Sequence, residues 1–146
     1  MSTYSNQAAI EGEIPQIDLI ALTDDDGRGT LNITILNQVI TNSSGEIDQA
    51  CANLYGTQLP FNPVPSSVAN MALTIACYRL VRRRQTADEQ NKFYEQYKRV
   101  RDFLDRVNSG DAHIDDIPFR DFPQVAFTGR STIYGNRSSN WPASSM

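Results

Sequence analysis

A stripe of mostly apolar residues runs along positions 36–54 with the spacing of an α-helix. Its members lie four, three, four, three and four positions apart: Leu36, Ile40, Ser43, Ile47, Ala50 and Leu54. Because a helix turns once in about 3.6 residues, this spacing places them all on one face, whereas a strand would need an alternating pattern. Positions 41–45 are five poor helix formers, Thr-Asn-Ser-Ser-Gly, so the sequence leaves open a kink or a break at that point.

Three other segments carry helix signals. Pro15 opens a short apolar segment that reaches Leu22, because proline at the first helical position loses no hydrogen bond. The segment from about Val68 to Arg84 is apolar nearly all round, which is typical of the buried centre of a bundle. The last segment repeats the spacing of four and three at Phe93, Tyr97, Val100, Leu104 and Val107.

Thr86 and Glu89 precede this last segment with the spacing of a capping box, which predicts that its helix begins there. Together the four segments predict an all-α fold. We expect a small four-helix bundle over residues 14–110, with its third helix in the centre. A flexible N-terminal segment at residues 1–13 would precede the bundle, and a long extended C-terminal arm at residues 111–146 would follow it.

The predicted C-terminal arm combines helix-breaking prolines with many apolar side chains. Pro118, Pro123 and Pro142 exclude a helix. Few aromatic residues are expected in a disordered tail, yet the apolar residues here include Ile117, Phe119, Phe122, Val125, Phe127, Ile133, Tyr134 and Trp141. We expect the arm to pack on another subunit or another protein, with a segment folded back on its own bundle as the alternative.

Charge is divided unevenly along the chain. The net charge of −4 is made up of −7 in residues 1–56, +4 in residues 57–110 and −1 in residues 111–146. Copies of such a chain can meet acidic face to basic face. Asp24, Asp25 and Asp26 form the densest acidic group, which we expect on the acidic face or along a channel.

Four arginines, Arg79, Arg82, Arg83 and Arg84, end the third predicted helix. They could form ion pairs within the chain, where cations also complement the helix dipole. They could instead bind nucleic acid, although the net negative charge argues against a dedicated DNA-binding protein. The interpretation that we favour is contact with the acidic half of a neighbouring subunit.

The aspartate cluster is also a candidate calcium loop. With Asp24 as the first ligand of a twelve-residue loop, Arg28 occupies the fifth ligand position and Ile35 the twelfth, which should be an acid. We therefore expect no metal there, but an acidic turn that caps the second helix.

Catalytic motifs are lacking. His113 is the only histidine, and the sequence contains neither a GxSxG motif nor a Gly-rich phosphate loop. Cys51 and Cys77 fall inside helical patterns without a CxxC pair, so we expect two buried, reduced core residues. No apolar run reaches the ~20 residues of a membrane span. The sequence predicts a protein that is not an enzyme and holds no cofactor.

Several short motifs follow one another in a recognisable order. LTDDDGRG at residues 22–29 follows the first predicted helix, and SGEID at residues 44–48 lies in the second. A Leu59-Pro60 connector leads to YRLVRRR at residues 78–84, and YEQY at residues 94–97 lies in the last helix. This order, over about residues 14–110, resembles the head–tail adaptor family of Mu-like and other long-tailed bacteriophages.

The resemblance implies a helical ring protein, commonly of twelve copies, beneath the portal of the filled capsid. The implied partners are further copies of the chain, the portal protein and a stopper or tail-terminator protein. Genomic DNA would pass through without sequence-specific binding, and no membrane is involved. The place would be the neck of the virion, after assembly in the host cytoplasm. The alternatives are a small nucleic-acid-binding module that uses Arg79–Arg84, and a bacterial scaffolding or regulatory protein that binds a partner through its tail.

Overall fold

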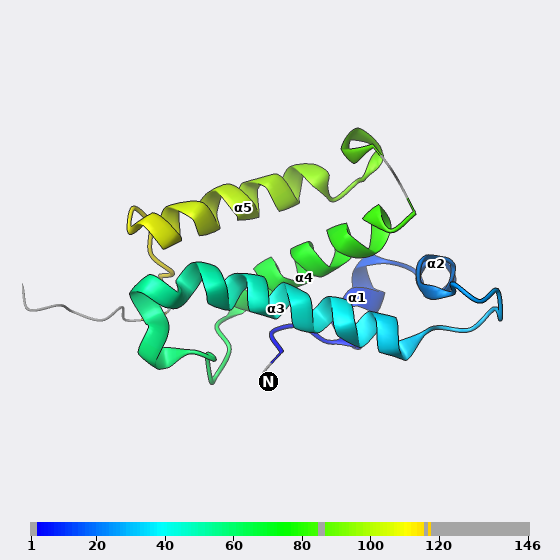
Figure 1. Ribbon diagram of the computed structural model, residues 1–146, viewed down its shortest axis with the longest axis horizontal. Coiled ribbons are helices and arrows are strands. Elements are labelled where there is room, and N and C mark those ends of the chain that lie inside the picture. The colour runs from blue at the N-terminus through cyan, green and yellow to red at the C-terminus, as the bar shows by residue number, and fades with distance from the viewer. Residues whose placement is uncertain (1–2, 85–86, 116, 118–146) are drawn as a thin grey trace, which may run out of the picture.

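The computed structural model contains five α-helices and no strand in the residues it describes, which are 3–84, 87–115 and 117. The all-α prediction is confirmed, with one helix more than predicted. Two short 3₁₀ turns, η1 at Gly56–Gln58 and η2 at Asp88–Gln90, join the longer helices (Figure 1). The helices are α1 at Gln7–Glu13, α2 at Gln16–Thr23, α3 at Ile33–Tyr55, α4 at Ser66–Arg82 and α5 at Tyr94–Ser109.

Helix α3 runs unbroken through the stretch of poor helix formers. Ser43 and Ser44 have their hydroxyls satisfied within the helix, since they donate to the carbonyls four residues earlier at 2.7 Å and 3.1 Å. Both serines are fully buried. The Ser44 hydroxyl also accepts the backbone N–H of Tyr4 at 2.8 Å, so the small side chains at this point make room for the N-terminal segment.

Helix α1 lies in the segment that we expected to be flexible, and that expectation was wrong for residues 7–13. The side chain of Asn6 caps the helix by accepting the N–H of Ala9 at 2.9 Å. Ile10 is fully buried against α4 and its neighbours. A helix of seven residues is too short to display a period, so the sequence pattern could not predict it.

Tyr4 fastens the chain ahead of α1 to the core. Its hydroxyl donates to the carboxylate of Asp48 on α3 and accepts the backbone N–H of Phe61 at 3.1 Å. Burial, together with the hydrogen bond to Asp48, raises the pKa of the Tyr4 phenol. The residue therefore links three segments that lie far apart in the sequence.

Helix α4 is central, as the sequence predicted, because it contacts α1, α2, α3 and α5. One group of buried residues lies near the C-terminal end of α3, and it includes Tyr55, Phe61, Val68, Ile75 and Leu104. A second group lies toward α1 and α2, and it includes Ile10, Leu19, Leu36, Cys77 and Leu80. Within the described ranges, no helix combines the length and apolar character needed to cross a membrane.

Helix α5 begins at Tyr94, later than the predicted capping box at residues 86–89. Glu89 lies in η2, and Thr86 lies outside the described residues. Asn91 organises the start instead: its side-chain amide donates to the carbonyl of Tyr78 at 3.1 Å, and its side-chain oxygen accepts the N–H of Phe93 at 3.0 Å. The buried amide thus joins this turn to α4, a contact that no local motif announces.

The first residues of the predicted arm belong to the core. Gly110 ends α5 with a φ of 89°, a conformation that favours glycine. The chain then turns back, and the N–H of Ile114 donates to the hydroxyl of Tyr55 at 2.8 Å. Ile114 and Ile117 are buried against α3 and its neighbours, so the boundary predicted at residue 111 is too early.

We predict that Tyr4→Phe lowers the free energy of unfolding by roughly 1–3 kcal/mol, because the buried N–H of Phe61 loses its acceptor. Urea titration would measure this. The matched control is Tyr94→Phe, whose hydroxyl makes no hydrogen bond within the described part of the chain, and we expect a change within about 0.5 kcal/mol. Equal effects of the two substitutions would contradict the proposed role of Tyr4.

The two cysteines should be inert in the folded protein. Burial raises the pKa of the Cys51 and Cys77 thiols to about 12, so both remain protonated at pH 8. Ellman's reagent should therefore leave the native protein unlabelled over minutes and react with both thiols in 6 M guanidinium (a concentration of about this size unfolds most domains). Rapid labelling without denaturant would show that the core around these residues opens readily.

Candidate functional site

Two arginines tie the end of α4 to the loop between α2 and α3. The Nη2 atom of Arg83 lies 2.7 Å and 2.6 Å from the two carboxylate oxygens of Asp25, and Nη2 of Arg84 donates to the same carboxylate at 2.9 Å. Their Nε atoms donate to the carbonyls of Leu22 and Ala21 at 3.1 Å and 3.2 Å. Helix α2 has no basic residue in its last turn, so these guanidinium groups complement its C-terminal carbonyls from another helix.

Glu46 on α3 gathers a second polar cluster. Arg79 of α4 and Arg101 of α5 contact its two carboxylate oxygens at 3.3 Å and 3.0 Å, and the Tyr97 hydroxyl donates to it at 3.3 Å. The Glu46 side chain is only 12% exposed, so its charge needs these partners. Burial and the neighbouring Glu46 raise the pKa of the Tyr97 phenol. The cluster joins all three long helices.

Arg82 forms a third contact, with the turn that precedes α5. Its Nη1 atom donates to the Tyr78 hydroxyl at 2.6 Å and to Asp88 at 3.2 Å, and the same hydroxyl donates to Asp88 at 2.8 Å. Burial and the bond to Asp88 raise the pKa of the Tyr78 phenol. The ring of Tyr78 also stacks on that of Tyr97, with centroids 4.0 Å apart.

All four predicted arginines therefore contact carboxylates of their own chain. This is the intrachain alternative from the sequence, and the contact with a neighbouring subunit stays a prediction. The partners Asp25, Glu46 and Asp88 were not singled out as such from the sequence. Glu46 lies 33 positions from Arg79, and Asp25 lies 58 positions from Arg83, so no local spacing could pair them.

The aspartate loop is shaped by its own backbone. The two carboxylate oxygens of Asp24 accept the N–H groups of Arg28 at 2.9 Å and Gly29 at 2.6 Å, which lowers the pKa of Asp24. Asn32, not an aspartate, caps α3 by accepting the N–H of Ile35 at 3.2 Å. The sequence had predicted that the acidic turn caps the helix that the structure labels α3. That prediction was wrong, because the Asp24 carboxylate instead accepts N–H groups within the turn. Across the described ranges, no group of three or more acids, histidines or cysteines is placed to hold a metal ion.

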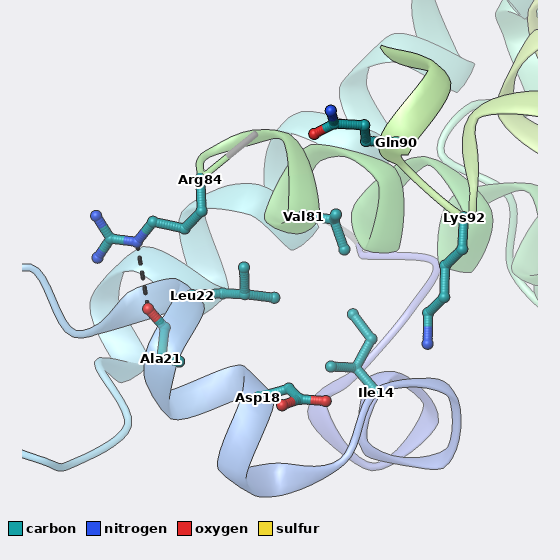
Figure 2. Close-up of a pocket in the computed structure, with 8 residues that line it drawn as sticks. All are labelled: Ile14, Asp18, Ala21, Leu22, Val81, Arg84, Gln90 and Lys92. Carbon is teal, nitrogen blue, oxygen red and sulfur yellow. Dashed lines mark hydrogen bonds between the residues drawn. The ribbon is translucent and has the colours of Figure 1, made fainter. Parts of the chain in front are cut away.

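Two hollows lie on different sides of α4. Figure 2 shows the first, which we call the α2 pocket, where side chains of α2 face those at the end of α4. It measures about 340 Å³ and is lined by residues that include Ile14, Asp18, Leu22, Val81, Arg84 and Lys92. The second, which we call the arginine groove, lies between α3 and α4 and measures about 380 Å³. Its lining includes Ile35, Gln38, Val39, Arg79, Arg82 and Arg83.

The other predicted contact residues are in the C-terminal arm. They lie outside the described residues: Phe119, Phe122, Val125, Phe127, Tyr134 and Trp141. Their predicted role in binding a subunit or the portal stays a prediction. Of the predicted acidic residues, Asp24 and Asp25 are engaged within the chain, while Asp26 is exposed and lies 3.7 Å from Arg28.

We predict that Asp25→Asn lowers the stability of the folded protein and that the size of this loss depends on pH. The hydrogen bond from Arg83 lowers the pKa of Asp25 in the folded protein, so its stabilising effect is present above the ordinary aspartate pKa of about 3.9 and is lost as the pH falls through the lowered value. The variant should be less stable than the wild type in thermal melts at pH 7, and this gap should close below about pH 4. The control is Asp102→Asn on the exposed face of α5. If the difference in melting temperature between Asp25→Asn and the wild type persists unchanged to pH 2.5 (about one unit below the ordinary pKa), the ion pair of Asp25 with Arg83 does not stabilise the fold as predicted.

Comparison with known proteins was informative at the level of the family. A family model described as "Bacteriophage Mu, Gp36" matches residues 4–117. The matched region starts at the core residue Tyr4 and ends at the core residue Ile117, so it covers all five helices. No curated protein matches the chain. Since the match spans well over half of the 146 residues, the chain belongs to the bacteriophage Mu Gp36 family.

Proposed function

We propose that this protein is a structural component of a tailed-phage virion, a head–tail adaptor that forms a ring beneath the portal. Membership of the Mu Gp36 family over residues 4–117 is the observation on which the proposal rests. The ring, of about twelve copies as in the adaptor family that the sequence resembles, would join the capsid to a stopper or tail-terminator protein. Genomic DNA would pass through its centre, and the protein would catalyse no reaction.

The state of the arginines supports an assembly role over nucleic-acid binding. A DNA-binding surface gains affinity from cationic groups that replace the counterions of phosphates. Each of Arg79, Arg82, Arg83 and Arg84 lies within 3.3 Å of a carboxylate of its own chain. Pairing with these carboxylates reduces the positive charge that the arginines offer to the phosphates of duplex DNA.

The side chains with shifted pKa values also have structural explanations. The lowered pKa values belong to Asp24 and Asp25, which accept hydrogen bonds that shape the α2–α3 loop. The raised values of Cys51 and Cys77 follow first from burial. Perturbed groups of a catalytic centre converge on a cleft. Here these four side chains either form hydrogen bonds that hold the α2–α3 loop or are buried in the core. This supports a non-catalytic role.

The C-terminal arm provides the test of attachment to the portal. We predict that replacing Phe119, Phe122, Phe127 and Trp141 by serine in the full-length chain abolishes binding to the portal protein of the same phage, because buried aromatic residues dominate such contacts. Negative-stain images and mass photometry of the two purified proteins would measure complex formation. The melting temperature of the free variant should be unchanged.

Val64→Ser is the control, since it removes an exposed apolar side chain from the connector before α4. Normal portal binding by the fourfold variant would refute the role of the arm. The nucleic-acid alternative would be supported instead if the wild-type protein does not bind the portal protein but binds duplex DNA. The affinity for DNA should then fall steeply as the salt concentration rises.

A further inference from the structure

Among the described residues, the arginine groove is lined only by α3 and by the C-terminal end of α4. Helix α5 runs beside α3, as Figure 1 shows. Its contacts with α3 extend from the Tyr97 hydroxyl, which donates to Glu46, to Asn108, which accepts from the side chain of Asn53. The groove lies between the N-terminal half of α3 and the last turns of α4. The groove combines apolar side chains of Ile35 and Val39 with exposed Gln38 and the three arginines. Ile33, which is 45% exposed, begins the same helix.

The groove retains unused hydrogen-bond donors. The Nε atom of Arg79 is buried and has no hydrogen-bond partner among the described residues. Arg82 donates only from Nη1 within this part of the chain, which leaves its Nε and Nη2 hydrogens available. A buried donor without a partner is costly. The groove is therefore suited to a partner that brings carboxylate oxygens together with an apolar side chain.

One segment of the same protein has this composition. The α1–α2 corner, which we define as Glu11, Glu13, Ile17 and Asp18, precedes the first basic residue of the chain, Arg28. Ile17 is 77% exposed, the most exposed of the large apolar side chains in the described residues. None of the three acids forms an ion pair within the described ranges. Asp18, Arg84 and Lys92 line the α2 pocket (Figure 2). Ile17 is not among the residues that line it.

The groove and the corner lie on opposite sides of α4. Successive helical residues are rotated by about 100°, so Arg79 and Val81 point about 200° apart. Arg79 lines the groove, whereas Val81 lines the α2 pocket with Ile14 and Asp18. One copy therefore cannot place its own corner in its own groove, but it can offer the corner to one neighbour and the groove to another.

We propose that the α1–α2 corner of one copy docks in the arginine groove of the next. Ile17 would pack against Ile35, which is partly exposed, next to the buried Val39. The acidic side chains would accept hydrogen bonds from the arginines. The inference rests on the proposed ring, and it names the two surfaces that hold the ring together. A contact between two different surfaces repeats from copy to copy and closes into a ring when the rotation allows, whereas a contact between identical surfaces stops at a dimer.

Cysteine cross-linking tests the contact directly. In the full-length double variant Ile17→Cys/Gln38→Cys, oxidation should produce a ladder of disulfide-linked dimers, trimers and longer chains on a non-reducing gel. The native Cys51 and Cys77 are buried and should not interfere. Ile17→Cys/Asp102→Cys, with the second thiol on exposed α5, is the control and should give no ladder. Cross-linking of Ile17→Cys alone into dimers would overturn the proposal, because it would indicate contact between identical surfaces.

Charge changes provide an independent test that leaves the groove arginines in place. Asp18→Lys and Gln38→Glu alter exposed residues without ion pairs in the described part of the chain. Each should raise the protein concentration needed for half-maximal ring formation by roughly tenfold, and their combination should restore most of the loss because a new opposite-charge pair forms. Asp102→Lys makes the same charge change on α5 and should have no effect.

Ring formation would be followed by mass photometry of the full-length protein, with and without the portal protein. If the wild type forms rings but the ladder is missing and both charge variants assemble normally, the proposed interface is wrong while the adaptor function stands. If the wild type forms no oligomer under either condition, the ring itself and the interface both fall.

Discussion

The whole fold depends on keeping α4 out of water. This helix is apolar on nearly every side, and it can be stable only if each side has something to cover it. Helix α3 and helix α5 pack against two sides of it, and α1 and α2 pack against others. The N-terminal segment is therefore part of the domain, since without it Cys77 and Leu80 would face solvent. The same requirement explains why Ile114 and Ile117 return to the core after α5 has ended.

Polar contacts then fix how the helices are set against one another. Glu46 reaches both α4 and α5, and Asp25 holds the end of α4 against α2. Tyr4 and Tyr55 each use one hydroxyl to hold a backbone N–H from a distant segment. Apolar packing alone tolerates several arrangements, whereas these bonds have directions and favour one. They also determine which arginine donors remain for a neighbour.

The sequence was most informative where apolar spacing extended over several turns. It predicted α3 from Leu36 to Leu54 and the central position of α4 correctly. It missed α1, which has a single large apolar residue at Ile10, and it placed the start of α5 too early, because the contacts of Asn91 with Tyr78 and Phe93 are not a local motif. The arginines were identified as important, yet their carboxylate partners were not, since pairs 33 and 58 positions apart leave no trace in local spacing.

The hydrogen bond from the N–H of Ile114 to the Tyr55 hydroxyl makes the two ends of the helical bundle different. It fixes the chain at the end of the bundle where α3 finishes, while α2 lies at the other end, as Figure 1 shows. Copies related by rotation about one axis would all present this exit point at the same height. In the proposed ring, every C-terminal segment would then emerge from the same circular rim, and the two faces of the ring would differ chemically. Such a ring could recognise a capsid component on one side and a tail component on the other without needing two kinds of subunit.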